Sequence, residues 1–255
     1  MKKVVLVTGA QMGTGYAIAC RFAKEGYGVA ITSRKQESAE AAAAELGKTY
    51  GCFAKGYELN IRNEDRVREI FADLDANDCF VETVVLNAAD LGFGDDPVKG
   101  MDFFTVPVEE FQRVFETNLV WNFTIVRQAA LRMKEHHKGA IVFISSNTAY
   151  RAIPNRSAYC ASKGGINSMS KAFAVDLGKY GIRSNVVLPG TIKTDRWKKM
   201  GGEAIGGSQA PLGEISDFED VANAAFFLGS DQSKNVTGTE FAVDGGMSCQ
   251  LLPAK

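Results

Sequence analysis

The chain has 255 residues, of which 45% are hydrophobic and 23% are charged, and its formal net charge at pH 7 is −1. This composition is ordinary for a globular protein, and the length suits one α/β domain with a sizeable core. The near-zero charge gives no electrostatic case for nucleic acid or an anionic membrane as a partner. No apolar run approaches the roughly 20 residues needed to span a bilayer.

The five cysteines are widely spaced and include no Cys-x-x-Cys pair. The odd number and the wide spacing predict free thiols in a reducing compartment, and no disulfides or zinc site. The apolar residues 4–7 run into Thr8 and Gly9 and not into a cleavage site, so we interpret them as a strand and not as a signal peptide. We therefore expect a cytoplasmic protein without a metal.

A glycine-rich turn follows this first strand. It contains Gly9, Gly13 and Gly15, and residues 16–23 then have helical periodicity. Glycines permit a tight turn and close approach to a ligand, and the N-terminus of the helix offers N–H groups and a positive dipole end to a phosphate. This context predicts a dinucleotide-binding site; the alternative is a turn without a ligand.

Residues 28–32 predict a second strand, which ends at Ser33 and Arg34. In a βαβ unit, this end lies near the adenosine ribose of a dinucleotide. An acidic residue there binds the 2′-hydroxyl of NAD, whereas a guanidinium suits a 2′-phosphate. Arg34 therefore favours NADP(H) over NAD(H); the alternative is a solvated charge at a strand end.

The rest of the chain continues to alternate between strands and helices, with no internal boundary, linker or repeat. Long loops in compact domains are often functional, and two are expected here: residues 90–106, which are rich in glycine, and a substrate lid at residues 191–209. The periodicity predicts further strands at residues 52–59, 81–86, 140–144, 183–188 and 241–243, and helices at residues 36–46, 63–74, 107–134 and 218–228.

Ser146 follows the strand at residues 140–144, and the next helix carries Tyr159 and Lys163. Positions i and i+4 share a helical face, so the phenol and the ammonium can point the same way. A lysine cation favours the phenolate and lowers the tyrosine pKa from about 10, which makes Tyr159 a plausible acid or base near neutral pH. Tyr-x-x-x-Lys alone also occurs by chance on solvated helices.

Two further positions lie near the same predicted sheet edge. Asn87, Ala88 and Ala89 follow the strand at residues 81–86, and small residues there leave room for a ligand. Asn118 interrupts the long helix that follows, where an asparagine can mark a local opening of the backbone hydrogen-bond ladder.

In order and spacing, these markers resemble the short-chain dehydrogenase/reductase family over nearly the whole chain. The resemblance implies a single doubly wound Rossmann-type domain, with a seven-stranded, mostly parallel sheet and helices on both faces. The markers are Thr8-Gly9-x-x-x-Gly13-x-Gly15, Asn87-Ala88-Ala89, Asn118, Ser146, Tyr159-x-x-x-Lys163, Pro189-Gly190 and Thr194.

The resemblance also implies a mechanism, in which the nicotinamide carries a hydride between a ketone and a secondary alcohol. Tyr159 would move a proton on the substrate oxygen, and Ser146 would hydrogen-bond that oxygen. Lys163 would lower the Tyr159 pKa and bind the nicotinamide ribose. Asn118 would hold a water that links Lys163 to solvent.

Further residues follow from the resemblance, as does a homotetramer formed through helices 107–134 and 157–179. The implied cofactor-binding residues are Gly9, Gln11, Gly13, Thr14, Gly15, Ser33, Arg34, Asn60, Ile61, Asn87, Ala88, Ala89, Tyr159, Lys163, Pro189, Gly190, Ile192 and Thr194. The expected pocket for a small carbonyl or alcohol substrate is Leu91, Phe93, Thr148, Arg151, Ile153, Pro154 and Trp197. Arg151 there would clamp a carboxylate or phosphate, or pair with a surface acid.

Four departures from the family pattern leave the catalytic groups in place. Asn60 replaces the usual aspartate after the third strand, Thr14 lies between two glycines in place of isoleucine, and Leu86-Asn87-Ala88-Ala89 replaces Asn-Asn-Ala-Gly. The loop at residues 92–100 is longer than in the simplest members and is expected to shape substrate choice.

We weigh three functions. The leading one is an NADP(H)-linked carbonyl reductase or alcohol dehydrogenase, acting on a hydroxysteroid, a sugar-derived ketone or a small aliphatic ketone. The second is a 3-oxoacyl-[acyl-carrier-protein] reductase, which needs a basic surface such as Arg113, Arg127 and Lys134 would form. The third, a non-catalytic NADP(H)-sensing protein, is disfavoured because Tyr159 and Lys163 are both present.

Overall fold

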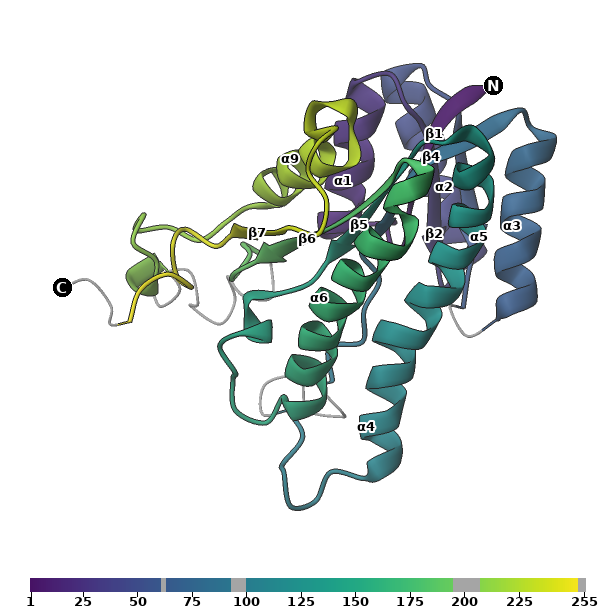
Figure 1. Ribbon diagram of the computed structural model, residues 1–255. Helices are drawn as coiled ribbons and strands as arrows, with labels where there is room; N and C mark the ends of the chain where they lie inside the picture. Colours follow the sequence, from purple (N-terminus) through teal and green to yellow (C-terminus); the bar gives the residue numbers. More distant parts are fainter. Residues whose placement is uncertain (61–62, 93–99, 195–206, 252–255) are drawn as a thin grey trace.

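In the computed structural model, which describes residues 1–60, 63–92, 100–194 and 207–251, seven strands form one sheet (Figure 1). The strand order is β3-β2-β1-β4-β5-β6-β7, and every neighbouring pair is parallel. The predicted doubly wound, seven-stranded sheet is confirmed, and it is parallel throughout. The strands are β1 Lys2–Val7, β2 Gly28–Ser33, β3 Ala54–Glu58, β4 Cys79–Leu86, β5 Gly139–Ile144, β6 Ile182–Pro189 and β7 Glu240–Val243.

Helices cover both faces of the sheet. One core forms where α1, α2 and α9 pack on it, and a second core forms under α3, α5 and α6 on the other face. These helices are α1 Gly13–Lys24, α2 Gln36–Tyr50, α3 Glu64–Ala76, α5 Trp121–His136, α6 Ser157–Leu177 and α9 Phe218–Gly229. Three short 3-10 helices also occur: η2 Asn147–Ala149, η3 Gly178–Tyr180 and η4 Asp231–Ser233.

The apolar run in β1 suits an interior strand of the sheet, between β2 and β4. Side chains alternate between the two faces of a strand. Val4 and Leu6 accordingly belong to the core under α3, α5 and α6, and Val5 and Val7 belong to the core under α1, α2 and α9. A strand that is buried on both faces needs an uninterrupted apolar run, as the sequence provides.

The strand order reverses between β1 and β4, and ligands in such sheets bind beyond the carboxyl ends of the strands at this point. Side-chain hydrogen bonds fix the two strand ends together. The Thr8 hydroxyl accepts from the backbone N–H groups of Asn87 and Ala88, each at 3.0 Å. The Asn87 side-chain amide donates to the carbonyls of Thr8 and Gly9 at 3.0 and 3.1 Å. The ligand edge is therefore rigid before any ligand binds.

The prediction of one long α-helix over residues 107–134 is wrong. It consists of α4 Val108–Phe115, a π-helix η1 Glu116–Val120, and then α5. The π-helix contains Asn118, so the local opening that an asparagine can mark occurs at this residue. The Asn118 side chain bonds the backbone of Asp90 at 2.7 and 2.9 Å. Single π-helical turns of this kind are frequent at functional sites.

Three global expectations concern membranes, metals and cysteines. Among the described residues, no helix is long and apolar enough to cross a membrane. The same residues contain no group of three or more His, Cys, Asp and Glu side chains placed to hold a metal ion. All five cysteines are free thiols, as their spacing predicted.

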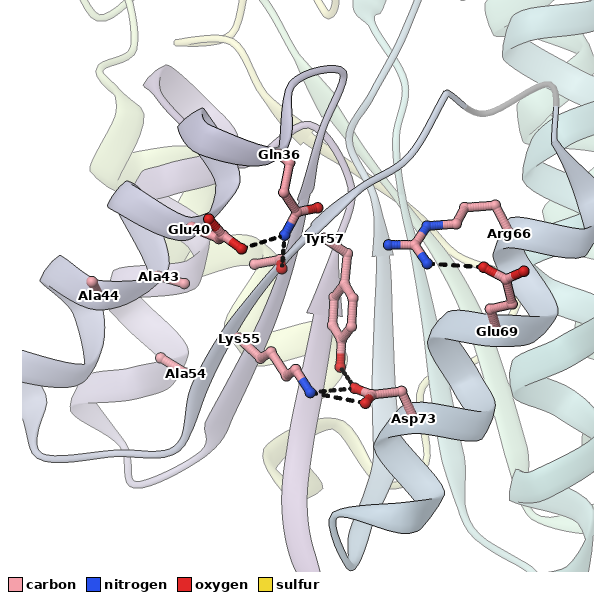
Figure 2. A pocket seen from close by; sticks show the side chains of 11 residues that line it. Gln36, Glu40, Ala43, Ala44, Ala54, Lys55, Tyr57, Arg66, Glu69 and Asp73 are labelled. Atoms are coloured by element: carbon pink, nitrogen blue, oxygen red, sulfur yellow. Dashed lines mark hydrogen bonds and ion pairs between the residues drawn. The ribbon is translucent and has the colours of Figure 1, made fainter.

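A cavity of about 500 Å³ lies at the β3 edge of the sheet, between α2 and α3 (Figure 2). Its charged side chains pair with one another. Asp73 accepts from the Tyr57 hydroxyl at 2.6 Å and from the Lys55 ammonium at 2.9 Å, and Arg66 pairs with Glu69 at 2.9 Å. Because its charges are already neutralised by neighbours, we interpret the cavity as a structural joint between β3 and α3.

We expect Asp73→Asn to lower the free energy of unfolding at pH 7, because it removes the ion pair with Lys55. The expected loss is only about 1 kcal/mol, because the Asp73 side chain is partly exposed and water screens the pair. Its hydrogen bonds to Lys55 and Tyr57 hold the pKa of the Asp73 carboxyl below its ordinary value. A lowered folded-state pKa stabilises the protein above the unfolded pKa, and this stabilisation is lost as the pH falls through the folded pKa.

Urea unfolding at pH 7 and at pH 3 measures this effect. The difference between wild type and Asp73→Asn is expected to narrow at the lower pH. Glu69→Gln is the control on the same helix, since Glu69 forms an exposed pair and its loss is expected to change little. A difference that stays constant between the two pH values would contradict the argument.

Candidate active site

The glycine-rich turn after β1 has the features that a dinucleotide phosphate requires. Gly9 and Gly13 have φ angles of +62° and +60°, a region that favours glycine. A Cβ on Gly15 would lie 2.6 Å from the Asn87 side-chain nitrogen, so only glycine allows this close packing. Among the described residues, no side chain caps the N-terminus of α1 and its first turn contains no acid. Its N–H groups therefore suit an anion.

Polar groups at the end of β2 lie on the same edge. The Thr32 hydroxyl accepts from Gly9 N at 3.3 Å, and the buried Ser33 hydroxyl accepts from Lys35 N at 3.3 Å. Arg34 and Lys35 are exposed, and within the described part of the chain neither forms an ion pair. Two unpaired cations at this position are suited to a phosphate.

The remaining predicted cofactor residues lie at other strand ends, apart from Ile61, which lies outside the described residues. Asn60 follows β3 and is exposed. Gly190 follows β6 and donates to Val243 O at 2.9 Å, and Ile192 forms an isolated parallel bridge with Ser216. The Oε1 atom of Gln11, in the glycine-rich turn, is buried and has no hydrogen-bond partner among the residues that the structure describes. The set as a whole fits a dinucleotide that extends along the carboxyl edge of the sheet.

Ser146, Tyr159 and Lys163 come together at the junction of β5 and α6. The Ser146 hydroxyl accepts from Thr148 N at 3.1 Å, and Ser146 lies close enough to Tyr159 to lower the pKa of the phenol. The Lys163 ammonium lies 5.5 Å from the centre of the Tyr159 ring and donates to Ile144 O at 2.8 Å. A serine hydroxyl and a phenol that lie this close can both reach one substrate oxygen.

Burial sets the proton affinities of this group. Burial raises the pKa of Tyr159 to about 12, against the lowering effects of the Ser146 hydrogen bond and the Arg156 charge. Burial also lowers the pKa of Lys163 to about 7. The expected lowering of the Tyr159 pKa by Lys163 is therefore wrong, because desolvation outweighs the neighbouring charges. At neutral pH the phenol keeps its proton and is a proton donor.

Asn118 connects the π-helix to the same centre. It is fully buried, and its side-chain nitrogen donates to the Ser162 hydroxyl at 2.9 Å. That hydroxyl donates in turn to the carbonyl of Tyr159 at 2.8 Å. Its predicted role in holding a water beside Lys163 stays a prediction.

The predicted substrate pocket is only partly described, because Phe93, Trp197 and lid residues 195–206 lie outside the described residues. Leu91 and Ile153 are exposed, and the hydroxyl of Thr148 is buried with no hydrogen-bond partner in the described part of the chain. Pro154 is also exposed. The Arg151 guanidinium donates to the carbonyl of Met247, so this segment near the C-terminus contacts the loop after β5.

Sequence reasoning missed Asp90 and Arg156. Arg156 is 6% exposed and donates to the carbonyl of Gly92 at 3.4 Å, close to Tyr159. Its position three residues before Tyr159, directly before α6, was the available signal. Asp90 gave no signal of its own, since its partners come from a distant helix.

Comparison with known proteins agrees with this geometry. Residues 9–248 match the family described as enoyl-(acyl carrier protein) reductase. The chain is 33% identical over 257 residues to 2-(S)-hydroxypropyl-CoM dehydrogenase 3 of Xanthobacter autotrophicus, which covers 96% of each chain. It is 32% identical over 250 residues to the 3-oxoacyl-[acyl-carrier-protein] reductase FabG of Staphylococcus aureus, covering 97% of this chain and 98% of FabG.

Solved structures give the same result. A short-chain type dehydrogenase/reductase from Mycobacterium marinum has a TM-score of 0.87 and 28% identity, covering 97% of this chain and 96% of that one. ElxO with NADPH bound also has a TM-score of 0.87, with 29% identity, covering 98% of this chain and all (100%) of ElxO.

Proposed function

The chain belongs to the short-chain dehydrogenase/reductase family, whose members act on hydroxyl and carbonyl groups, and we propose that it interconverts a ketone and a secondary alcohol with NADP(H). The observation that carries the proposal is the position of the Lys163 ammonium, 5.5 Å from the centre of the Tyr159 ring, with Ser146 close enough to the phenol to lower its pKa. This group lies at the sheet edge where the glycine-rich turn also ends.

In the proposed reduction, Tyr159 donates its proton to the substrate oxygen as that oxygen gains negative charge. Ser146 donates a hydrogen bond to the same oxygen and stabilises the charge that develops there. Lys163 would hydrogen-bond the nicotinamide ribose of a bound cofactor and, with Asn118, would return a proton to Tyr159. The nicotinamide, when bound, supplies the hydride. Oxidation of the alcohol follows the same path in reverse.

A panel of ketones tests the reaction class. Consumption of NADPH and of NADH is followed in parallel with steroids, sugar-derived ketones, small diketones and acetoacetyl esters. Turnover on one of these groups supports the proposal and identifies the substrate class. Tight binding of NADPH without turnover on any of them would favour the sensing function in place of the enzyme.

The preference for NADP(H) depends on Arg34. An exposed, unpaired guanidinium beside the adenosine ribose favours a 2′-phosphate by charge-assisted hydrogen bonds. We expect Arg34→Asp to lower the ratio of kcat/KM for NADPH to that for NADH by about ten- to a hundredfold, because the 2′-phosphate then meets a carboxylate. Steady-state kinetics with both cofactors measure the ratio.

Lys48→Asp is the matched control for Arg34→Asp. Lys48 is exposed on α2, the helix that follows Arg34, and lies in its last turn, so the same change of charge there is expected to leave the ratio unaltered. An equal effect of both substitutions would assign the change to net charge. An unaltered ratio in Arg34→Asp would exclude Arg34 as the group that binds the 2′-phosphate.

A 3-oxoacyl-[acyl-carrier-protein] reductase is the second candidate, favoured by the 32% identity to FabG. The basic docking surface that this candidate needs is weakened, because two of its cations already pair with acids. Arg113 pairs with Glu110 at 2.6 Å, and Arg127 pairs with Glu64 at 2.5 Å. Both cations are thus neutralised by neighbouring acids. A preference for acetoacetyl-carrier protein over a short acetoacetyl thioester would establish this candidate in place of the first.

The proposal includes a single domain over residues 1–255, a homotetramer and a cytoplasmic location. Exposed apolar side chains on the two helices named for the interface support the tetramer: Val120, Phe123, Leu131 and Val175 are between 44% and 81% exposed. The five free thiols suit a reducing compartment.

A further inference from the structure

Residues 90–92 follow β4 and lie directly beside Tyr159. A Cβ on Gly92 would lie 3.5 Å from the Cβ of Tyr159. On one side, the Asn118 side chain accepts from Asp90 N at 2.7 Å and donates to Asp90 O at 2.9 Å. On another side, the buried Arg156 guanidinium donates to Gly92 O. The position of this short segment and the position of the phenol are therefore coupled.

The Asp90 carboxylate connects the same segment to α4. One oxygen accepts from Gly92 N at 2.9 Å, and the other forms an ion pair with the Arg113 guanidinium. The Asp90 side chain is 15% exposed and that of Arg113 is 35% exposed, so water and salt screen this pair less than a surface pair. Arg113 belongs to the last turn of α4, directly before the π-helix that carries Asn118.

Loss of either charge has a physical consequence for this segment. A carboxylate at 15% exposure without its guanidinium has no opposite charge to offset its desolvation. We expect it to turn toward water, which removes the acceptor of the Gly92 N–H. The segment that Asn118 holds is then no longer fixed relative to α4.

We propose that Asp90 and Arg113 are a positioning pair, which fixes residues 90–92 against the π-helix and thereby holds Asn118 and Tyr159 in their reactive arrangement. The connection continues inward, since Asn118 donates to Ser162 at 2.9 Å and Ser162 donates to the Tyr159 carbonyl at 2.8 Å. Both residues act through these neighbours, so they are positioning residues. The expected effect on the reaction rate rests on the proposed function, whereas the fixing of residues 90–92 by the positioning pair does not.

The charged and titratable groups around this junction come from several elements. Arg156 directly precedes α6, and Cys160 and Lys163 lie on it. From α4, Glu110 shares the Arg113 guanidinium at 2.6 Å. Glu110 is 37% exposed and lies on the outer side of the pair, which makes Glu110→Gln the matched control.

The first test is amide hydrogen exchange at Asp90 and Gly92 in the full chain. Arg113→Gln and Asp90→Asn are expected to speed exchange by about tenfold, Arg113→Lys to restore it in part, and Glu110→Gln to leave it as in the wild type. Unaltered exchange in Arg113→Gln and Asp90→Asn would overturn the inference. The double variant Asp90→Asn with Arg113→Gln removes both charges and so leaves no unpaired carboxylate. Fast exchange in this variant would show that the loss of the ion pair itself, and not only a buried charge without a partner, loosens residues 90–92.

The second test is kinetic, on the substrate class found with the ketone panel. Arg113→Gln and Asp90→Asn are each expected to lower kcat by about ten- to a hundredfold and to leave the KM for NADPH nearly unaltered. Each is also expected to raise the pH at which alcohol oxidation reaches half its maximal rate. Glu110→Gln keeps the wild-type profile. Fast exchange with wild-type kcat and pH profile would overturn positioning and leave a structural pair. If the wild type turns over no ketone, the proposed function fails. The hydrogen-exchange result alone then decides whether Asp90 and Arg113 fix residues 90–92.

Discussion

Tyr159→Phe is expected to lower kcat for ketone reduction by about 10²- to 10⁴-fold, the range that general acid catalysis supplies. The phenyl ring keeps the packing of α6 but has no proton to donate to the substrate oxygen. The affinity for NADPH is expected to stay nearly unaltered, because the glycine-rich turn and Arg34 are untouched. Stopped-flow or steady-state kinetics measure kcat, and quenching of protein fluorescence measures NADPH binding.

The pH profile of the wild type follows from the same residue. Burial raises the Tyr159 pKa to about 12, so the proton-donor form is fully present through neutral pH. Loss of the Tyr159 proton is expected to slow reduction only as the pH approaches that pKa. The rate of alcohol oxidation is expected to rise with pH, because it requires the phenolate. A rate of alcohol oxidation that does not rise with pH would contradict Tyr159 as the group that exchanges the proton.

Tyr150→Phe is the control for this substitution. Tyr150 ends the short helix η2 close to Ser146, but its side chain is 61% exposed. Removal of its hydroxyl is expected to leave kcat and the pH profile as in the wild type. Turnover that persists in Tyr159→Phe would show that another group donates the proton.

The sheet was predictable because its signal is local. The apolar run of β1 and the glycines that follow it determine a buried strand, a tight turn and a helix within a short stretch of chain. An opening at Asn118 was one interpretation of the residue type. The partner of Asn118 could not be predicted, since Asp90 lies 28 residues earlier and only the packing of the π-helix against the segment after β4 brings the two together.

The proton affinities of the site were not predictable for a different reason. The spacing of Tyr159 and Lys163 correctly indicates that they share a helical face, but it gives no measure of how much water reaches them. Lys163 is 2% exposed, and burial alone moves its pKa from about 10.5 to about 7. The predicted shift of the Tyr159 pKa therefore has the wrong sign, because the neighbouring charge was considered without the cost of desolvation.

Lys163→Met is expected to lower kcat by about a hundredfold or more and also to stabilise the protein at neutral pH. The loss of activity follows from the missing contact to the ribose and from the missing proton path to Tyr159. The gain in stability follows from the removal of a buried cation. Methionine has a similar length and no charge, so it fills the space that Lys163 leaves.

The pH dependence of this gain has a definite sign. Between about pH 7 and 10.5, the unfolded chain holds a proton on Lys163 that the folded protein has released, so wild-type stability rises with pH in this window. Below pH 7, both states hold the proton, and the folded protein carries the full cost of a buried charge. The advantage of Lys163→Met is therefore expected to be largest below pH 7, at about 2 kcal/mol after the lost hydrogen bond to Ile144 O is counted, and to disappear near pH 10.5.

Urea unfolding of both proteins at pH 6 and at pH 9.5 measures this difference. Lys171→Met is the control on the same helix. Lys171 is 59% exposed and pairs with Glu240 at 2.5 Å, so its removal is expected to lower stability slightly. Lower stability of Lys163→Met at pH 6 would show that the folded protein stabilises the Lys163 ammonium. A variant that is more stable and nearly inactive would instead show that Lys163 opposes folding and is retained for the reaction.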